Sequence, residues 1–179
     1  MPEIEIRPAT NEDIPSLIAF DHSYTSDYVW QMEIQREEHQ TGVIFREARL
    51  PRSVQVRYPR SPQQLTDDWN QRDGLLVATT ESEIVAYACL MQNMAPQTTW
   101  MTDLLVMRRL RRQGIGTALI LASQAWALHK TSRRLILEMQ PKNYPAIQFA
   151  ARLGFELCGY NDHYYANNDI ALFFSKWLR

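Results

Sequence analysis

The hydrophobic pattern at the start of the chain predicts a strand followed by a helix. Polar and apolar side chains alternate over residues 3–7, which is typical of a strand with one buried face. The sequence TNED at residues 10–13 then carries the signature of a helix start. Apolar side chains follow at helical spacing, at Ile14, Leu17, Ile18 and Phe20.

The rest of the chain shows a pattern of alternating strands and helices. Three apolar or alternating runs, at residues 75–79, 84–91 and 98–106, are separated by turn-forming residues and predict successive antiparallel strands. The further elements that we expect are a helix at 114–130, a strand at 134–139, a helix at 144–153 closed by Gly154, and strands at 155–160 and 170–177. Without a repeat or a linker, this order indicates one α/β domain of the mixed α+β kind over residues 1–179.

The pattern is weakest at about residues 24–72. This segment contains an acidic stretch at 31–39 and strand-like runs at 43–50 and 54–58. A turn marked by two prolines, YPRSP, then leads into a short expected helix that contains Leu65 and Trp69.

Composition places the chain among globular proteins. With 179 residues, 45% of them hydrophobic and 22% charged, it can bury one core without disulfides. No apolar run approaches the roughly 18 residues that span a bilayer, and residues 1–10 lack the pattern of a signal peptide. We therefore expect a cytoplasmic protein with no membrane partner. Cys89 and Cys158 lack the spacing of a disulfide framework or a zinc site, so we expect no metal and place both in the core.

Charge is distributed unevenly along the chain. Residues 1–83 hold 15 acidic and 8 basic residues, whereas residues 84–179 hold 5 acidic and 11 basic residues. Between Asp103 and Glu138 no acidic residue occurs, but seven basic residues do: Arg108, Arg109, Arg111, Arg112, Lys130, Arg133 and Arg134. This one-sided stretch indicates an anionic ligand. A pI of 6.4 argues against nucleic acid, so a small polyphosphate is the preferred interpretation.

A glycine-rich turn is the strongest motif for that anion. Residues 101–119 run from a strand through an arginine-rich turn to Gly114 and Gly116 at the start of a helix. Glycines allow backbone N–H groups to approach a ligand, and a helix N-terminus attracts a diphosphate. Arg111 and Arg112 would add charge-assisted hydrogen bonds. The alternative is a structural turn with a solvated arginine cluster.

Two other phosphate-binding motifs fit less well. The Walker sequence G-x-x-x-x-G-K-[ST] is absent. A dinucleotide fingerprint would use Gly114, Gly116 and an acidic residue such as Glu138, but Leu119 stands where its third glycine belongs. A nicotinamide cofactor is therefore the weaker alternative.

Two motifs resemble a known family. The sequence RRQGIG at residues 111–116, after a strand that ends in LLV, resembles the R/Q-x-x-G-x-G/A acyl-CoA loop of the GNAT superfamily of N-acetyltransferases. The sequence LEMQPKNYPAIQFAARLGFELCGY at residues 137–160 is similar to that superfamily's L-E-x-x-x-x-N-x-x-A-x-x-x-Y-x-x-x-G-F segment. The resemblance is closest to the streptothricin and ribosomal-protein N-terminal acetyltransferases. It covers residues 98–165 well and residues 27–73 hardly at all.

The resemblance implies a mainly antiparallel central sheet flanked by helices, and acetyl-CoA as the co-substrate. The backbone of Leu104, Leu105 and Val106 would pair with the pantetheine arm in a gap between strands. The pyrophosphate would lie against Arg111, Arg112, Gln113, Gly114, Ile115, Gly116 and Thr117. The pantetheine would also contact Asn143, Ala146 and Phe149. For Asn143, a simple helix cap is the alternative.

Glu138 is the candidate general base, because an apolar strand can raise its pKa toward neutrality and because it matches the glutamate of the N-terminal acetyltransferases. An outward-facing Glu138 in a salt bridge is the alternative. The family's thiolate-protonating tyrosine falls at Ala150, so another phenol must act. We favour Tyr164 or Tyr165 over Tyr144, with His163 as a weaker candidate base.

The acceptor depends on the segment at about 24–72, which the resemblance leaves unmatched. Its acidic residues favour a cationic amine, unless they form only a solvated face: Asp27, Glu33, Glu37, Glu38, Asp67 and Asp68. We expect an N-acetyltransferase that acts on a small cationic, antibiotic-like amine, with a protein N-terminus or lysine as the alternative. A non-catalytic acyl-CoA-binding module is the alternative from another class, and a homodimer is compatible with the sequence.

Overall fold

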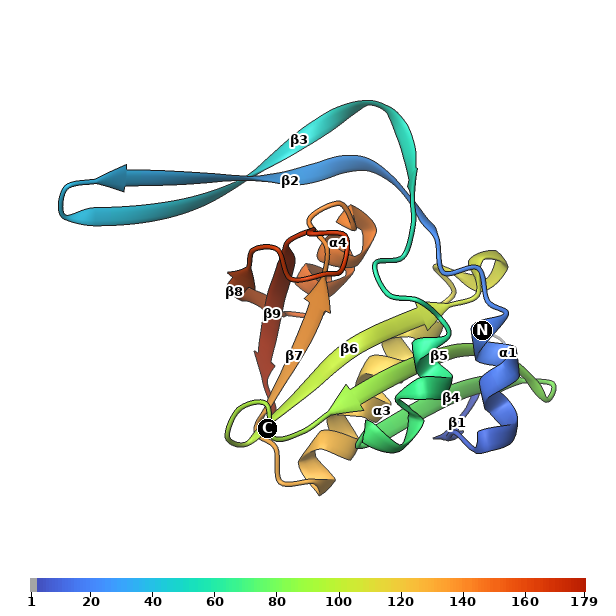
Figure 1. Ribbon diagram of the computed structural model, residues 1–179. Coiled ribbons are helices and arrows are strands. Elements are labelled where there is room, and N and C mark those ends of the chain that lie inside the picture. The colour runs from blue at the N-terminus through green and yellow to red at the C-terminus, as the bar shows by residue number, and fades with distance from the viewer. Residues whose placement is uncertain (1–2) are drawn as a thin grey trace.

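A twisted seven-stranded sheet organises the chain in the order β1-β4-β5-β6-β7-β9-β8 (Figure 1). The computed structural model describes residues 3–179, apart from the side chain of Asn70. The strands of the sheet are β1 (Glu5–Pro8), β4 (Gly74–Thr80), β5 (Glu83–Met91), β6 (Thr98–Val106), β7 (Arg134–Met139), β8 (Glu156–Asn161) and β9 (Ala171–Trp177). All neighbours pair antiparallel except β6 and β7. The predicted mixed, mainly antiparallel sheet is confirmed.

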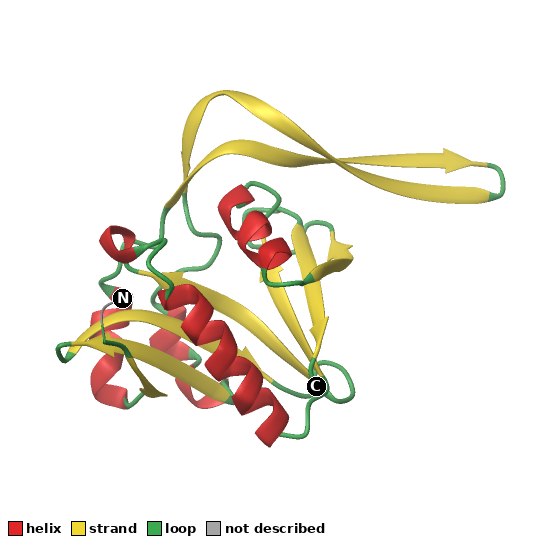
Figure 2. Cartoon of the chain, turned by 180° about the vertical axis from the view of Figure 1, so that it is seen from behind, coloured by secondary structure: helices red, strands yellow, loops and turns green. Residues whose placement is uncertain are grey.

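Helices cover both faces of this sheet (Figure 2). The helical elements are η1 (Asn11–Asp13), α1 (Ile14–Ile18), α2 (Gln64–Asp67), η2 (Trp69–Gln71), η3 (Arg108–Leu110), α3 (Ile115–His129) and α4 (Tyr144–Arg152). Apolar residues of α3 and α4, such as Leu119 and Ile147, pack against the sheet in the larger core cluster. Leu17 of α1 and Leu65 of α2 belong to a second cluster with Tyr87 of β5. Burial of these apolar side chains stabilises the layered arrangement.

The predicted start of the first helix is confirmed. Thr10 donates from its backbone N–H to Asp13 Oδ2 at 2.7 Å, and Asp13 also pairs with the Arg7 guanidinium at 2.7 Å. These bonds hold the pKa of Asp13 down to about 2, with the Arg7 hydrogen bond as the largest cause. The carboxylate thus ties β1 to the first turn of the helix.

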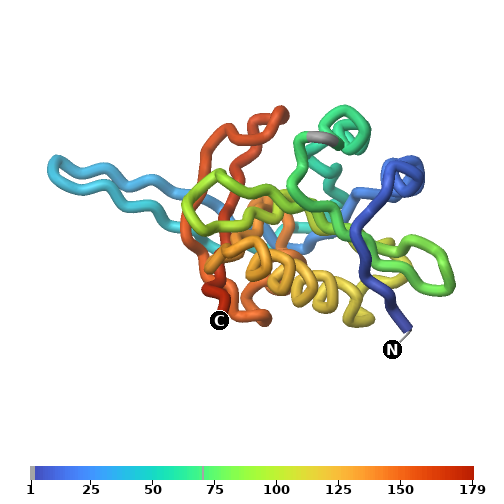
Figure 3. Tube along the Cα trace, turned by 90° about the horizontal axis from the view of Figure 1, so that it is seen from below, coloured from blue at the N-terminus to red at the C-terminus, as the bar shows by residue number. Residues whose placement is uncertain are grey.

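The segment at 24–56 forms a long two-stranded arm, which the sequence did not predict. It consists of β2 (Tyr24–Glu37) and β3 (Gln40–Val56), which pair only with each other among the described residues. Figures 1, 2 and 3 show the arm leaving the body on one side. The acidic stretch at 31–39 is strand and turn, and the runs at 43–50 and 54–58 belong to one strand that ends at Val56. The pattern was weak because most of the arm is exposed on both faces.

The base of the arm packs against the C-terminal part of the sheet. The Trp30 ring lies 5.8 Å from the ring of Phe174, and the Phe45 ring lies 5.6 Å from that of Tyr160. The Trp30 backbone N–H donates to Pro141 O at 3.0 Å. Residues 35–42 at the tip are all exposed. The body therefore fixes the base of the arm and not its tip.

The two cysteines differ in environment. Cys89 is fully buried on β5, as expected, and burial raises the pKa of its thiol. Cys158 is exposed, so its placement in the core was wrong. It lies at a β-bulge of β8, where Leu157 and Gly159 pair with consecutive residues of β9 and the residue between them has no partner. Within residues 3–179, no helix is long and apolar enough to span a membrane.

Candidate active site

The parallel strands β6 and β7 separate halfway along their length. They pair from Thr98 to Met101 on β6, and the pairing ends there although both strands continue. At the same point Thr102 forms a bulge, because Met101 and Asp103 pair with consecutive residues of β5. A bulge bends its strand and increases its twist. The edge of β6 that faces β7 is therefore unpaired from Thr102 to Val106 in the described chain.

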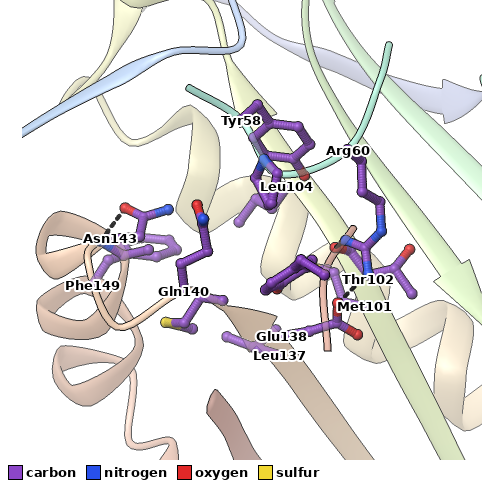
Figure 4. Close-up of a pocket in the computed structure, with 14 residues that line it drawn as sticks. Tyr58, Arg60, Met101, Thr102, Leu104, Leu137, Glu138, Gln140, Asn143 and Phe149 are labelled. Carbon is purple, nitrogen blue, oxygen red and sulfur yellow. Dashed lines mark hydrogen bonds and ion pairs between the residues drawn. The ribbon is translucent and has the colours of Figure 1, made fainter. Parts of the chain in front are cut away.

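A pocket occupies the gap between the separated strands (Figure 4). Six of the sequence-predicted site residues line it: Leu104, Glu138, Asn143, Ala146, Phe149 and Tyr165. They come from β6, β7, α4 and the loop between β8 and β9. Asn143 also caps α4, since its side-chain oxygen accepts a 3.3 Å hydrogen bond from the Ala146 N–H. The fold thus brings together residues from four elements that are far apart in the sequence.

The Glu138 side chain has no exposed surface. Its Oε1 pairs with the Arg60 guanidinium, and its Oε2 accepts a 3.0 Å hydrogen bond from the Tyr164 hydroxyl. Burial raises the pKa of Glu138, and the Arg60 charge opposes that rise. The sequence left two hypotheses for Glu138, a carboxylate in a dry environment and an outward-facing carboxylate in a salt bridge. The side chain has the buried environment of the first and the salt bridge of the second, and it points inward.

Sequence reasoning missed Tyr58 and Arg60, which line the pocket, and Asp103, which lies in contact with both. The Tyr58 hydroxyl donates to Asp103 Oδ1, and Arg60 donates to the backbone oxygen of Thr102 at 2.9 Å. The Asp103 side chain is 5% exposed and lies 3.5 Å from the Arg60 guanidinium. Tyr58 and Arg60 belong to YPRSP, whose prolines indicated only a turn. The sequence signal that could have indicated Tyr58 and Arg60 as pocket residues was an arginine between two prolines, close to a tyrosine.

The aromatic candidates lie in different places. Tyr164 touches Glu138, and burial together with that carboxylate raises the pKa of Tyr164 to about 12. Tyr165 lines the pocket under Arg60, whose guanidinium carbon lies 5.2 Å from the centre of the ring. Tyr144 stacks instead on Tyr28 at the base of the arm. Of these phenols, only Tyr164 and Tyr165 are near Glu138.

The candidate base His163 and the position of the family tyrosine, Ala150, do not line the pocket. His163 is exposed and lies 3.2 Å from the Asp162 carboxylate. Ala150 is fully buried in the core of the domain. The position where the family carries a tyrosine therefore holds a small packing residue in this chain.

The glycine-rich turn lies at the N-terminus of the 15-residue helix α3. Gly114 has φ +89°, in the left-handed region that favours glycine. A Cβ atom on Gly116 would lie 3.3 Å from Phe149 and 3.7 Å from Val106, so a side chain there would be crowded. The helix start, the unpaired edge of β6 and helix α4 thus approach one another closely at Gly116.

The predicted anion-binding side chains of this turn are not equivalent. Arg111 points inward and donates to the backbone oxygens of Val106 at 2.9 Å and Ser23 at 3.1 Å. Arg112 and Gln113 are exposed, whereas Ile115 and Leu105 are buried in the core. Backbone N–H groups at a helix start, with exposed polar side chains beside them, suit a diphosphate. The residues present therefore fit the pyrophosphate of an acyl-CoA.

The acidic residues of the variable segment do not gather at the pocket. Glu33 and Glu37 lie on the protruding part of β2, and Glu38 lies in the turn at its tip. The carboxylate that lines the pocket is Glu138 on β7, and the nearby Asp103 on β6 contacts the pocket residue Arg60. Within residues 3–179, no group of three or more His, Cys, Asp or Glu side chains could hold a metal ion.

Comparison with known proteins identifies the family. A profile of the acetyltransferase (GNAT) family matches residues 26–155. A nourseothricin acetyltransferase aligns with a TM-score of 0.82 and 22% identity, over 98% of this chain and 99% of its own. A Bacillus anthracis protein assigned as a streptothricin acetyltransferase, solved with acetyl coenzyme A, gives 0.77 and 18%, over 98% and 99%. A search of curated protein sequences gave no match.

A third similar structure widens the range of acceptors within this fold. The ribosomal-protein-S18-alanine N-acetyltransferase of Escherichia coli aligns with a TM-score of 0.67 and 16% identity, over 98% of this chain and 94% of its own. These similarities agree with the resemblance of the two sequence motifs, and the family profile covers more than half of the chain. The protein therefore belongs to the GNAT family, as an acetyltransferase that takes its acetyl group from acetyl-CoA and transfers it to an amine.

Proposed function

We propose that the acceptor is a small cationic amine of the antibiotic type. The observation that carries this proposal is a pair of buried carboxylates where β6 and β7 separate: Glu138 lines the pocket, and Asp103 lies next to it, 3.5 Å from the guanidinium of the pocket residue Arg60. Buried carboxylates attract a cation, and the aromatic rings of Tyr58 and Tyr165 add faces that favour one. The similar nourseothricin and streptothricin acetyltransferases support the antibiotic part of the proposal, since their names give nourseothricin and streptothricin as acceptors.

Acetyl-CoA would lie along the unpaired edge of β6. In this proposal the backbone of Leu104, Leu105 and Val106 pairs with the amide-rich pantetheine. The backbone of the glycine-rich turn, residues 111–117, holds the pyrophosphate at the start of α3. Asn143, which caps α4, and Ala146 and Phe149 of α4 would form the opposite wall, where they already line the pocket. The thioester would then point toward Glu138.

Glu138 would be the general base. A protonated amine cannot attack a thioester, so it must first give up a proton, and the buried Glu138 carboxylate would accept it. The amine nitrogen then forms a bond to the acetyl carbon, the bond from that carbon to the CoA sulfur breaks, and the acylated nitrogen releases its second proton to solvent. The leaving thiolate needs a proton of its own.

Tyr164 would supply that proton. Burial and the negative charge of Glu138 both raise the pKa of Tyr164, and the effect of the charge disappears when Glu138 takes the proton of the amine. Tyr164 can then protonate the thiolate and recover a proton from Glu138 through their 3.0 Å hydrogen bond. This coupling would replace the tyrosine that the family carries at the position of Ala150. It also favours an enzyme over a non-catalytic CoA-binding module.

An amine screen tests the acceptor. The release of the CoA thiol would be measured with acetyl-CoA and a streptothricin, an aminoglycoside, spermidine, a peptide with an N-terminal alanine and a lysine peptide. The proposal predicts the highest kcat/KM for one of the small polycations. A preference for either peptide would establish the protein acceptor instead. Acetyl-CoA binding without turnover of any amine would favour the non-catalytic module.

A further inference from the structure

The segment that links the arm to α2 passes over the pocket. This segment, residues 57–63, is called the strap below. It contributes Tyr58, Pro59 and Arg60 to the lining of the pocket, on the side opposite to β7. The two prolines of YPRSP restrict the backbone on both sides of Arg60. The strap therefore presents this arginine with little backbone freedom.

The Arg60 guanidinium joins groups from three other elements. It pairs with Glu138 on β7, lies 3.5 Å from Asp103 on β6, and donates to the backbone oxygen of Thr102 at 2.9 Å. Its guanidinium carbon lies 5.2 Å from the centre of the Tyr165 ring, in the loop between β8 and β9. The side chain is 23% exposed. Among the described residues that line the pocket, Arg60 is the single basic one.

This position has an electrostatic consequence for Glu138. The charged or titratable groups that face Glu138 are Arg60, Asp103, Tyr164 and Tyr165. Burial and the neighbouring Asp103 both favour the neutral acid, whereas Arg60 favours the carboxylate. Without Arg60, two carboxylates would share a buried site without a cation, an arrangement that proteins avoid by binding a proton.

We propose that Arg60 is a positioning residue of the acetyl transfer, which holds the Glu138 carboxylate ionised and oriented toward the acceptor. This inference rests on the proposed role of Glu138 as the base. Arg60 would act from the strap, through its contacts with Glu138 and Asp103, and would not itself touch the reacting atoms. It also reduces the excess negative charge of the pocket, so the strap contributes to the choice of acceptor.

The Arg60→Ala variant tests the proposal through the pH dependence of kcat. We expect kcat at pH 7 to fall about ten-fold or more, and the ascending limb of the profile to move upward by about one pH unit or more, because Glu138 loses its opposing charge. Arg60→Lys keeps the charge and should leave the limb close to that of the wild type. Arg57→Ala is the matched control, because Arg57 is an exposed arginine of the same strap.

Free guanidinium provides a second readout. Guanidinium chloride would be added at millimolar concentration, far below the molar range that unfolds proteins. It should restore part of the activity of Arg60→Ala and return the ascending limb of its pH profile toward that of the wild type. Sodium chloride at equal ionic strength should do neither. If Arg60→Ala does not fold, Arg60→Gln and Arg60→Lys are compared in the same way, and the limb should move only in the glutamine variant.

Two results would overturn the proposal. An unchanged pH limb in the folded Arg60→Ala or Arg60→Gln variant would leave Arg60 with a structural role only. A lower acceptor KM in Arg60→Ala, with guanidinium competing against the acceptor, would show that Arg60 occupies the acceptor site. The role of Glu138 is tested separately. If Glu138→Gln loses the ascending limb of the pH profile while Arg60→Ala keeps it at the wild-type pH, the inference about Arg60 fails and the assignment of Glu138 as the base survives.

Discussion

The Tyr164 hydroxyl donates a 3.0 Å hydrogen bond to Oε2 of Glu138, whose side chain has no exposed surface. The bond joins the loop between β8 and β9 to the centre of the sheet. It places a phenol and a carboxylate, the two kinds of group that can exchange a proton here, in direct contact. The following predictions begin from this pair.

Replacing Glu138 with Gln should lower kcat by about 100-fold or more, the usual contribution of a general base, while the similar shape preserves the fold. In the wild type, burial raises the pKa of Glu138, so activity should be lost as the pH falls through that raised value. Glu138→Gln should lack this ascending limb. Glu156→Gln, at an exposed position of β8, is the control. Thiol release measured across pH 5 to 9 checks the prediction, and a surviving limb in Glu138→Gln would contradict it.

Replacing Tyr164 with Phe should lower kcat about ten-fold or more and leave the acceptor KM nearly unchanged. The substitution keeps the edge contacts of the ring with Tyr165 and Phe173 and removes only the hydroxyl. Tyr165→Phe serves as the comparison, because the neighbouring Tyr165 lines the pocket. If Tyr165→Phe loses kcat and Tyr164→Phe does not, Tyr165 is the proton donor.

Replacing Gly116 with Asp should abolish acetyl-CoA binding. The new side chain would meet Phe149 and Val106, and its negative charge would repel the pyrophosphate at the start of α3. Gly42→Asp, at the open tip of the arm, is the matched control, since a Cβ atom there meets nothing within 4 Å.

Thermal shift measures this effect on binding. A ligand at 100 times its Kd should stabilise the wild type and Gly42→Asp by about 2.7 kcal/mol, and Gly116→Asp should show no shift. NADH should stabilise none of the three proteins. Equal acetyl-CoA shifts in both glycine variants would remove the glycine-rich turn from the binding site.

Replacing Asp13 with Asn should lower the free energy of unfolding at pH 7 by about 1 to 2 kcal/mol. The folded state holds the pKa of Asp13 near 2, below its ordinary 3.8, so the contribution is present above pH 4. It should disappear as the pH falls toward 2, where wild type and variant converge. Denaturant unfolding at several pH values checks this, with the exposed neighbour Glu12→Gln as control. A constant difference across the range would contradict the prediction.

The sequence predicted the elements whose burial is regular and missed those that depend on distant partners. Strand β7 was predicted at its exact bounds, because its apolar side chains are buried on both faces. The arm escaped prediction because its strands pair with each other while remaining largely exposed. Local pattern gives no register for such a hairpin.

The same distinction holds for the pocket. Glu138 and Asn143 lie in a motif with fixed spacing, so the resemblance found them. Arg60 is 78 residues from Glu138 in the chain, and only the path of the strap over the separated strands brings the two together. The bulge at Thr102, which opens the gap, has no signature in the residue pattern. Long-range geometry of this kind is not contained in local sequence.

The strap is a direct continuation of β3, since Arg57 alone separates the end of that strand at Val56 from Tyr58. The number of residues in β3 therefore sets how far along the pocket Arg60 reaches. An insertion that lengthens both strands of the arm equally leaves this measure unchanged. One residue added to β3 alone advances the chain by about 3.3 Å, which exceeds the tolerance of a hydrogen bond. The length of the exposed strand β3 thus determines whether Arg60 reaches the buried carboxylate of Glu138.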